Sequence, residues 1–440
     1  MRTLCNKPVH FLLTTFGSLG DVHPYIAVGL GLLRRGHRVT LATSEIYRAK
    51  VEGEGLSFHP LPPDVGMLLE NPEMMKKAYH PRTGSEYILR HVFMPPVAQQ
   101  YEDLLPAAKQ ADVLVGHPLA FALPTVAEVL GKPWVSVILQ PALIFSAYDP
   151  PSVSGAPLFE YFRGFGPAFW RAFAGMVRWV VRRWSKPLLR LRSELNLPAL
   201  RNPALDDMFS PFANHAWFSS ALAKPQPDWP AGMKVLGYPT YDKLEPGQGL
   251  SPDLNRFLEG GTPPIVFTLG SSAVFDAGSF YDESLRAARI LGARSVLLIG
   301  LDEENRPADL SDDVFVAQYA PYSELFGRAA AVVHQGGSGT TAAALRAATP
   351  AIFVPFSHDQ PDNARRVAGL GCARIVPRNR YRAERVAREL RALLDDPSVR
   401  IAADRVAAQL AAEDCVAAAC DDLERVARSF RDASNRSPEA

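Results

Sequence analysis

Residues Ala331 to Asn363 read AVVHQGGSGTTAAALRAATPAIFVPFSHDQPDN, and this stretch decides the fold. An apolar β-branched run is followed by a glycine-rich polar turn, which leads into an alanine-rich segment that favours helix. A second apolar run and a second polar loop complete the stretch. This order predicts a strand ending at Val333, a turn over His334–Thr340, a helix over Thr341–Ala347 and a strand over Ala351–Phe356.

The glycine-rich turn would lie at the N-terminus of the predicted helix. Backbone N–H groups point outward there, at the positive end of the helix dipole, so the turn can bind an anion. It has no Lys, which a Walker loop needs, and it lacks the spacing and the early position of a dinucleotide-binding Gly-x-Gly-x-x-Gly. From the glycines alone, a phosphate site and a turn that needs glycine only for its geometry both stay open.

A second polar loop, Ser357-His358-Asp359-Gln360, follows the second predicted strand. Both loops would leave the carboxyl ends of adjacent parallel strands, and open α/β sheets bind ligands at that edge. N–H donors for a diphosphate beside an Asp-Gln pair for sugar hydroxyls suit a nucleotide sugar. The two loops together therefore favour a nucleotide-sugar site.

The stretch resembles the donor-binding signature of UDP-glycosyltransferase-like enzymes with the GT-B architecture. The chain is most similar to the bacterial branch that includes sterol glucosyltransferases and the rhamnosyltransferase of rhamnolipid synthesis. The runs at His358–Ala364 and Phe267–Ser271 are especially similar to the rhamnosyltransferase, and the resemblance covers nearly the whole chain. It implies an α/β protein of GT-B fold, with two Rossmann-like doubly wound parallel-sheet domains facing a cleft.

Length and composition agree with two ordinary globular domains. A chain of 440 residues is too long for one typical core, and its 47% hydrophobic and 21% charged residues are typical of globular proteins. The net charge of +1 gives no electrostatic reason to expect nucleic acid. The four cysteines fit neither a zinc site nor a disulfide framework, which favours the reducing cytoplasm, and no apolar stretch is long enough to span a membrane.

The chain begins as a βαβ unit, with a strand over Val9–Thr15, a loop over Phe16–Pro24, a helix over Tyr25–Arg35 and a strand over Arg38–Thr43. From the residues alone, Asp21 is an N-cap or a first-turn charge. The resemblance implies a second role. Asp21 stands three residues before Pro24, as the catalytic histidine of plant members does, and inside the Gly-Ser-x-Gly-Asp-Val run of the bacterial branch.

The resemblance therefore implies that Asp21 is the general base, with His23 as the alternative base. Burial would raise the pKa of a carboxylate at this position towards the working range. His117 lies near the place of the aspartate that orients the histidine of plant members. An ion pair between His117 and Asp21 and a purely structural His117 both stay open.

The donor-binding residues are also implied by the resemblance. Ser271 and Ser272 would donate to the diphosphate or cap a helix, and Tyr319 would replace the indole that stacks on uracil in plant members. The predicted donor-binding residues are Gly20, Ser271, Ser272, Tyr319, Ala320, His334, Gly336, Gly337, Ser338, Gly339, Thr340, His358, Asp359 and Gln360. No metal is expected, because helix-end N–H groups and His334 would take the part of a cation.

One position departs from the plant pattern. Plant members place a glutamate eight residues after the histidine to bind both ribose hydroxyls, and here that position is Ala342. Because a deoxyribose lacks the 2′-hydroxyl, the missing glutamate favours dTDP-sugars without excluding UDP-sugars.

Aromatic and basic side chains alternate along a predicted helical run over Ala168–Leu195, which Pro187 kinks or splits. In one interpretation this is an amphipathic helix pair that walls the acceptor cleft. In the other, residues 168–193 make a peripheral contact with anionic lipid at the inner membrane surface or with a lipophilic acceptor.

Linker composition between Gly237 and Pro264 separates two series of strands. The predicted division is an acceptor-binding domain over 1–240, a linker over 241–263 and a nucleotide-sugar donor-binding domain over 264–415. The resemblance implies that a C-terminal helix over 416–440 returns to the first domain. The other predicted strands are Val113–Gly116, Trp134–Ile138, Trp217–Ser219, Lys234–Leu236, Ile265–Leu269, Val296–Ile299 and Val314–Ala317.

The resemblance implies an inverting glycosyltransferase without cofactor. It would move a hexose, glucose or rhamnose, from a UDP- or dTDP-sugar to a hydroxyl of a lipophilic acceptor such as a phenol or flavonoid, a sterol or a hydroxyacyl lipid. The alternatives are a non-catalytic nucleotide-sugar-binding protein and a nucleotide-sugar epimerase on the same scaffold.

Overall fold

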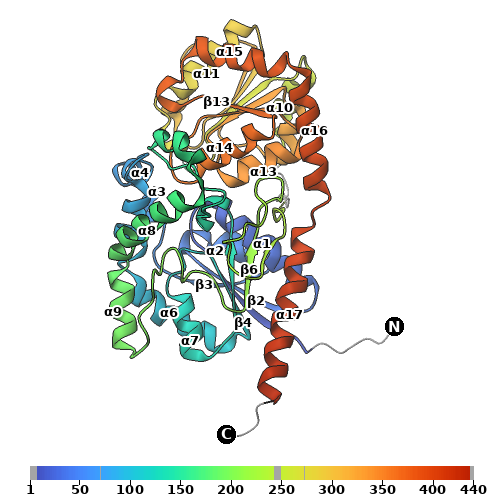
Figure 1. The fold of residues 1–440 in the computed structure, drawn as a ribbon. Coiled ribbons are helices and arrows are strands. Elements are labelled where there is room, and N and C mark those ends of the chain that lie inside the picture. The colour runs from blue at the N-terminus through green and yellow to red at the C-terminus, as the bar shows by residue number, and fades with distance from the viewer. Residues whose placement is uncertain (1–6, 70, 242–248, 272, 437–440) are drawn as a thin grey trace.

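The computed structural model describes residues 7–69, 71–241, 249–271 and 273–436, and Figure 1 shows two α/β layers one above the other. The lower sheet contains β1 (His10–Thr14), β2 (Arg38–Thr43), β3 (Ser57–Pro60), β4 (Val113–Gly116), β5 (Trp134–Ile138), β6 (Ala213–Ala216) and β7 (Met233–Val235). The upper sheet contains β8 (Ile265–Thr268), β9 (Ser295–Leu298), β10 (Val314–Ala317), β11 (Ala331–His334), β12 (Ala351–Phe353) and β13 (Ala373–Ile375).

Both sheets are parallel, and each reverses its strand order once. The lower sheet runs β3-β2-β1-β4-β5-β6-β7 and the upper sheet β10-β9-β8-β11-β12-β13. β11 pairs with β12 in parallel, as the opening stretch predicts. The order reverses between β1 and β4 in one sheet and between β8 and β11 in the other. These are the points at which open α/β sheets bind ligands.

The strands form where apolar runs are buried on both faces, as is usual for parallel sheets. β1, β4, β5, β8, β9 and β11 are buried along their whole length. The two strands that the sequence did not predict, β3 and β13, contain exposed or half-buried residues. Their apolar signal is weaker because they lie at the sheet edges.

Helices connect the strands. In the first half they are α1 (Leu19–Arg34), α2 (Arg48–Gly53), α3 (Gly66–Leu69), α4 (Pro72–Ala78), α5 (Gly84–Tyr87), α6 (Val97–Gln110), α7 (Leu123–Leu130), α8 (Gly166–Trp184) and α9 (Lys186–Glu194). In the second half they are α10 (Pro252–Glu259), α11 (Phe280–Leu291), α12 (Tyr322–Leu325), α13 (Ser338–Arg346), α14 (Gln360–Gly369), α15 (Ala383–Leu394), α16 (Pro397–Ala411) and α17 (Cys415–Arg436). Shorter helical turns are η1 (Glu45–Tyr47), η2 (Ile88–Phe93), η3 (Pro141–Ile144), η4 (Pro157–Phe165), η5 (Ala273–Asp276), η6 (Glu303–Asn305), η7 (Phe326–Arg328) and η8 (Arg378–Arg380).

The start of the first helix was predicted wrongly. α1 begins at Leu19 and not at Tyr25, so most of the predicted loop is its first turns. The cause is a capping box, in which the Ser18 side chain accepts a backbone N–H and the Asp21 side chain accepts the N–H of Ser18. The helix accommodates Pro24 within its second turn.

One further strand boundary differs from the prediction. β6 ends at Ala216, before the predicted strand over Trp217–Ser219. From Ala383 onward the chain forms three helices, and Asp396 caps the second by accepting the N–H of Ser398. Pro187 stands at the second residue of α9, so the long helical run is split there as predicted.

The C-terminal helix α17 lies against α1 and the lower sheet, and Figure 1 shows α16 and α17 along one side of both layers. The approach is close, since a Cβ on Gly31 would lie 2.6 Å from Val416 and 2.9 Å from the Cys420 Sγ. His215 of β6 bonds Asp422 of α17 at 2.8 Å. The domain boundaries stay a prediction, and linker residues 242–248 lie outside the described residues.

Candidate active site

The N-termini of α1 and α13 face each other between the two sheets. A Cβ on Gly20 would lie 3.9 Å from the backbone N of Gly339, and a Cβ on Gly339 would lie 3.6 Å from the Cα of Gly20. α1 follows β1 and α13 follows β11, so the meeting point lies beside both strand-order reversals. Two positive helix ends at one place favour a negatively charged ligand.

The turn before α13 depends on glycine. Gly336 has φ +95°, and a Cβ there would lie 3.0 Å from the Phe353 ring and 3.2 Å from the Gln360 carbonyl oxygen. Gly337 is the N-cap of α13, and no side chain caps the helix. The N–H groups of its first turn therefore remain available to a ligand.

His334 ends β11 and is fully buried against Phe353. Its Nδ1 accepts the N–H of Gly336 at 3.1 Å, which places the ring proton of the neutral side chain on Nε2. Among the described residues Nε2 has no hydrogen-bond partner. Burial lowers the pKa of His334 to about 3, so the role predicted for it in place of a cation would be that of an uncharged hydrogen-bond donor. It is a neutral N–H donor.

The second polar loop is tied to the first. Asp359 Oδ2 accepts hydrogen bonds from Ser338 Oγ at 3.1 Å and Asn363 Nδ2 at 2.7 Å. Gln360 Oε1 accepts the N–H groups of Phe356 and Ser357, so only its amide NH₂ group is left for a sugar. Burial raises the pKa of the Asp359 carboxyl to about 6.

Asp21 lies in the first turn of α1, opposite this loop pair. Its Oδ2 accepts the N–H of Ser18 at 2.9 Å and the Ser18 hydroxyl at 3.2 Å. Gly17, at φ +122°, leaves room for the carboxylate, because a Cβ there would lie 2.3 Å from Oδ2. Burial raises the pKa of Asp21 to about 7, while the Ser18 hydrogen bonds oppose the shift and the charge of Asp359 adds to it. Asp21 is thus a capping residue and a carboxylate whose pKa suits a base.

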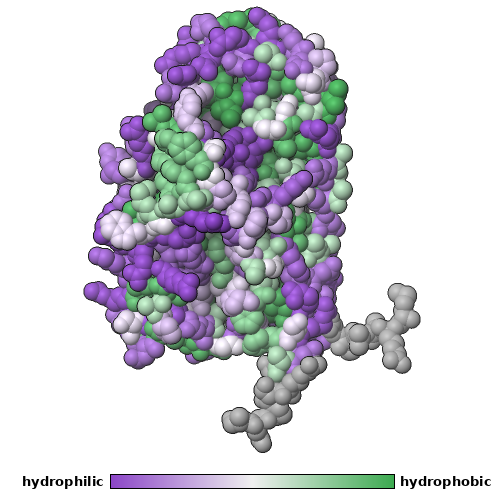
Figure 2. Space-filling view, viewed as in Figure 1, coloured by the Kyte–Doolittle hydropathy of each residue, from purple (hydrophilic) through white to green (hydrophobic). Residues whose placement is uncertain are grey.

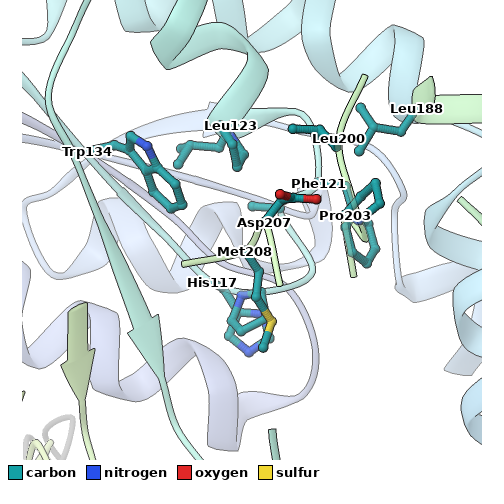
Figure 3. A pocket seen from close by; sticks show the side chains of 12 residues that line it. His117, Phe121, Leu123, Trp134, Leu188, Leu200, Pro203, Asp207 and Met208 are labelled. Atoms are coloured by element: carbon teal, nitrogen blue, oxygen red, sulfur yellow. The ribbon is translucent and has the colours of Figure 1, made fainter. Parts of the chain in front are cut away.

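His117 follows β4 and approaches Asp21 without forming an ion pair. Its Nδ1 accepts the N–H of Leu119, and its Nε2 lies 3.9 Å from Asp21 Oδ1. Burial lowers the pKa of His117 to about 3, so the ring is neutral. It also lines a cavity of about 10 Å³, the size of one water molecule; in Figure 3 His117 and Met208 lie at one end and Leu188 at the other.

His23 does not join this group. Two positions apart, Asp21 and His23 project from nearly opposite sides of α1. The His23 ring packs on Tyr241 with centroids 4.7 Å apart, and burial lowers its pKa to about 4. The alternative base therefore lies away from the facing helix ends.

The remaining predicted donor residues are spread more widely. Ser271 is exposed after β8, whereas Ser272 lies outside the described residues. After β10, Tyr319 is exposed, and Ala320 is buried. Thr340 is buried in α13. His358 contacts the first half of the chain instead, since its Nδ1 is 3.1 Å from Ser85 Oγ and its ring meets Tyr79.

Several residues of the site were not predicted. The Gln140 side chain, directly beyond β5, hydrogen-bonds Asp21. Asn363 donates to Asp359 and to the carbonyl oxygen of Gly336 at 2.9 Å. Both could have been found, because Gln140 follows a predicted strand and Asn363 belongs to the opening stretch.

A buried ion-pair group holds α14 against the loop after η3. Arg366 Nε bonds Asp362 at 2.6 Å, and Arg366 also pairs with Asp149 of the first half of the chain. The N–H of Ser152 donates to Asp362 at 3.0 Å. Removing one partner of a buried pair leaves an uncompensated charge, so this group fixes the loop of Asp359 relative to Asp21.

Two observations concern other ligands. Within the described ranges, no three His, Cys, Asp or Glu side chains gather closely enough to hold a metal ion. Of the helices described, none is long and apolar enough to cross a bilayer.

Two families of known proteins match the chain. Residues 11–134 match the glycosyltransferase family 28 N-terminal domain, and residues 286–426 match the erythromycin biosynthesis protein CIII-like C-terminal domain. The chain is 34% identical over 435 residues to the O-mycaminosyltylonolide 6-deoxyallosyltransferase of Streptomyces fradiae, covering 95% of this chain and 97% of the relative. It is 28% identical over 397 residues to a sterol 3-beta-glucosyltransferase of Debaryomyces hansenii, covering 84% of this chain but only 24% of that longer relative.

Solved structures share the fold. A glycotransferase of kitacinnamycin has a TM-score of 0.71 at 19% identity, over 96% of this chain and 99% of that chain. The calicheamicin glycosyltransferase CalG4 has a TM-score of 0.69 at 19% identity, over 96% of this chain and 98% of that chain. These likenesses confirm the predicted GT-B fold class.

Proposed function

The chain belongs to the GT-B glycosyltransferases with a family 28 N-terminal domain and an erythromycin CIII-like C-terminal domain, and from that membership we propose its reaction. It transfers a hexose, with rhamnose favoured over glucose, from a dTDP- or UDP-sugar to a hydroxyl of a lipophilic small molecule, with inversion. The observation that carries the proposal is the meeting of the α1 and α13 N-termini, with Asp21 on one side and His334 on the other.

The relatives support this choice of substrates. The Streptomyces fradiae protein is named for transfer of a 6-deoxyallosyl group to O-mycaminosyltylonolide, and the Debaryomyces hansenii protein for glucosylation of a sterol. Rhamnose is also a 6-deoxyhexose. The named relatives are transferases, which disfavours the epimerase and the non-catalytic binding protein.

In the proposed complex the donor diphosphate lies at the N-terminus of α13. The free N–H groups of Ser338 and Gly339, the Nε2–H of His334 and the side chain of Ser271 donate to it, and they stabilise the charge that develops as the diphosphate leaves. Tyr319 and Ala320 contact the base. Asp359 and the amide NH₂ of Gln360 bind sugar hydroxyls.

Asp21 is the proposed general base. Its carboxylate removes the proton from the acceptor hydroxyl, which attacks the anomeric carbon as the bond to the diphosphate breaks. Gln140 and Ser18 hold the carboxylate in place, and neutral His117 is the nearest further side chain that can donate to it. These roles rest on the position of the Asp21 carboxylate, whose pKa burial raises, where the two helix ends meet.

The pH dependence of the reaction follows from the pKa of Asp21. A base acts only when deprotonated, and this pKa is raised to about 7 by burial. We expect kcat/KM to rise with pH through about 7 and then level off. Initial rates from pH 5 to 9, with dTDP binding measured over the same range, check this. A rate that is already at its plateau at pH 5 would show that no base of raised pKa acts.

The preference between UDP- and dTDP-sugars tests whether the absence of a glutamate at position 342 affects donor binding. Ala342 is only 7% exposed and packs in an apolar cluster with Leu345 and Tyr238, so no carboxylate is available there for the ribose. A glutamate at this place would contribute roughly 1.5–3 kcal/mol to UDP binding. We therefore expect UDP-glucose to have no more than a modest advantage in kcat/KM over dTDP-glucose, below about tenfold. A UDP preference above about tenfold would mean that another residue reads the ribose or the base.

The substitution Ala342→Glu would place a charge among apolar side chains and would destabilise the fold. The donor comparison in the unaltered protein is therefore the cleaner test.

Activity itself is tested with a panel of donors and acceptors. dTDP-rhamnose, dTDP-glucose and UDP-glucose are each combined with a sterol, a flavonoid, a hydroxyacyl lipid and a macrolide lactone, and products are detected by mass. We expect one lipophilic alcohol to gain a hexosyl or deoxyhexosyl mass. Tight donor binding without transfer or slow donor hydrolysis would favour the non-catalytic alternative, and a change of the sugar without change of mass, seen by NMR, would favour the epimerase.

A further inference from the structure

Exposed apolar side chains gather on η4 and α8. Large hydrophobic residues here are unusually accessible to solvent. They are Leu158 (69% exposed), Tyr161 (81%), Phe165 (61%), Met176 (54%) and Trp179 (59%). Figure 2 shows hydrophobic side chains grouped on this face of the molecule, with hydrophilic ones beside them. Together with the cations described next, these residues form what we call the apolar–basic surface.

Cationic side chains continue this surface along α8 and α9. Arg182, Arg183, Lys186 and Arg190 are exposed. In the part of the chain that the structure describes, the ion pairs of α8 and α9 are those of Arg178 with Asp206 and Arg192 with Glu128. Among the described residues none of the four exposed cations is in an ion pair, and they favour an anionic partner.

The helix geometry joins the two kinds of side chain. Met176, Trp179 and Arg183 follow one another at spacings of three and four residues, which places them on one face of α8. The Arg183 guanidinium lies 3.6 Å from the centre of the Trp179 ring. Apolar and cationic groups thus face the same direction.

A groove lies at the cationic end. It has a volume of about 350 Å³ and runs between the start of α6 and α9. Lys186 and Arg190 line it together with Glu194 and apolar residues such as Val97 and Leu191. This size and lining suit an anionic headgroup with an apolar stem.

The surface differs from the one predicted over residues 168–193. Trp170 is buried, and Phe173 packs on Phe159 with ring centroids 4.6 Å apart. Arg178 and Arg192 are engaged in ion pairs. The exposed apolar part therefore begins earlier in the chain, on η4, and only one face of α8 contributes to it.

We propose that the apolar–basic surface docks on an anionic lipid bilayer. The side chains of η4 and α8 enter the headgroup region, while Arg182, Arg183, Lys186 and Arg190 pair with lipid phosphates. The exposed cations beside exposed apolar side chains match the phosphates and the acyl boundary of an anionic bilayer, where basic helices with apolar faces lie. The proposal is independent of the proposed reaction, since lipid binding is measured without donor or acceptor.

The test is sedimentation of the full chain with vesicles. The protein should bind vesicles of mixed phosphatidylglycerol and phosphatidylcholine, bind phosphatidylcholine alone weakly, and release at high salt. The double variant Arg183→Glu, Lys186→Glu should lower binding at least tenfold, because each basic residue near an anionic bilayer contributes roughly fivefold. Tyr161→Ser combined with Phe165→Ser should also lower it.

Matched controls lie in the second half of the chain. Arg391→Glu reverses an exposed charge on α15, and Leu301→Ser removes a side chain that is 77% exposed. Both should bind vesicles as the unaltered protein does, and circular dichroism checks that every variant is folded. The proposal is overturned if the unaltered protein does not bind anionic vesicles, or if Arg391→Glu weakens vesicle binding as much as the double variant does. A dimer in light scattering that Tyr161→Ser, Phe165→Ser dissociates, without vesicle binding, would instead assign the surface to a second copy.

Discussion

Asp21→Asn is expected to lower kcat by roughly 10²- to 10⁴-fold, the usual contribution of a general base. The amide keeps the size of the carboxylate and can still accept a hydrogen bond from Ser18, so the capped start of α1 should persist. The donor is proposed to lie at the N-terminus of α13, and the Kd for dTDP should therefore change little. Steady-state transfer rates and calorimetric titration with dTDP measure the two quantities.

The matched control is His23→Asn, two residues further along the same helix. His23 packs on Tyr241 and does not face the helix ends, so its replacement should leave the rate within a few-fold. If Asp21→Asn retains activity within a few-fold while His23→Asn or His117→Asn abolishes it, the base is a histidine and the assignment of Asp21 is wrong.

His334→Ala is expected to weaken donor and free dTDP binding together, by roughly 10- to 100-fold, as for loss of one hydrogen bond to a charged group. Its Nε2–H is a buried donor that has no partner among the described residues. The effect should be similar on donor and dTDP, because the contact is proposed with the diphosphate in both. Calorimetry with dTDP and inhibition by dTDP measure it.

Folding must be separated from binding in this experiment, since His334 is fully buried. His334→Asn keeps a side-chain acceptor for the N–H of Gly336 and should fold even if the alanine variant is unstable. His358→Ala is the control, because that half-buried ring contacts Ser85 and Tyr79 instead of the α13 turn. Unchanged dTDP affinity in a folded His334→Asn protein would make His334 a structural residue.

The strands and polar loops could be predicted because their signals are local. Continuous apolar runs mark β1, β4, β5, β8 and β11. Glycine-containing loops follow β1, β8 and β11, and the Asp-Gln loop follows β12. The start of α1 was missed because Pro24 suggested a helix beginning beside it, whereas Ser18 and Asp21 cap the helix earlier. The capping box was present in the sequence and was the better signal.

The meeting of the two halves could not be predicted from patterns. Gly20 and Gly339 are far apart in the chain, and the sequence around neither residue predicts that the two are in contact. The same holds for Arg366 with Asp149 and for Gln140 with Asp21. Charge states were equally hidden, since the neutral form of His334 results from complete burial and not from its place in the motif.

The anomeric configuration of the product tests the central claim most directly. The proposed site has one base beside the acceptor and one diphosphate site opposite it. This arrangement suits a single in-line displacement, which inverts the anomeric centre. NMR of the purified glycoside from a donor of known configuration gives the answer. We predict inversion in every molecule of product. Retention would require a covalent intermediate or another mechanism, and it would contradict the role of Asp21 as the base of a direct displacement.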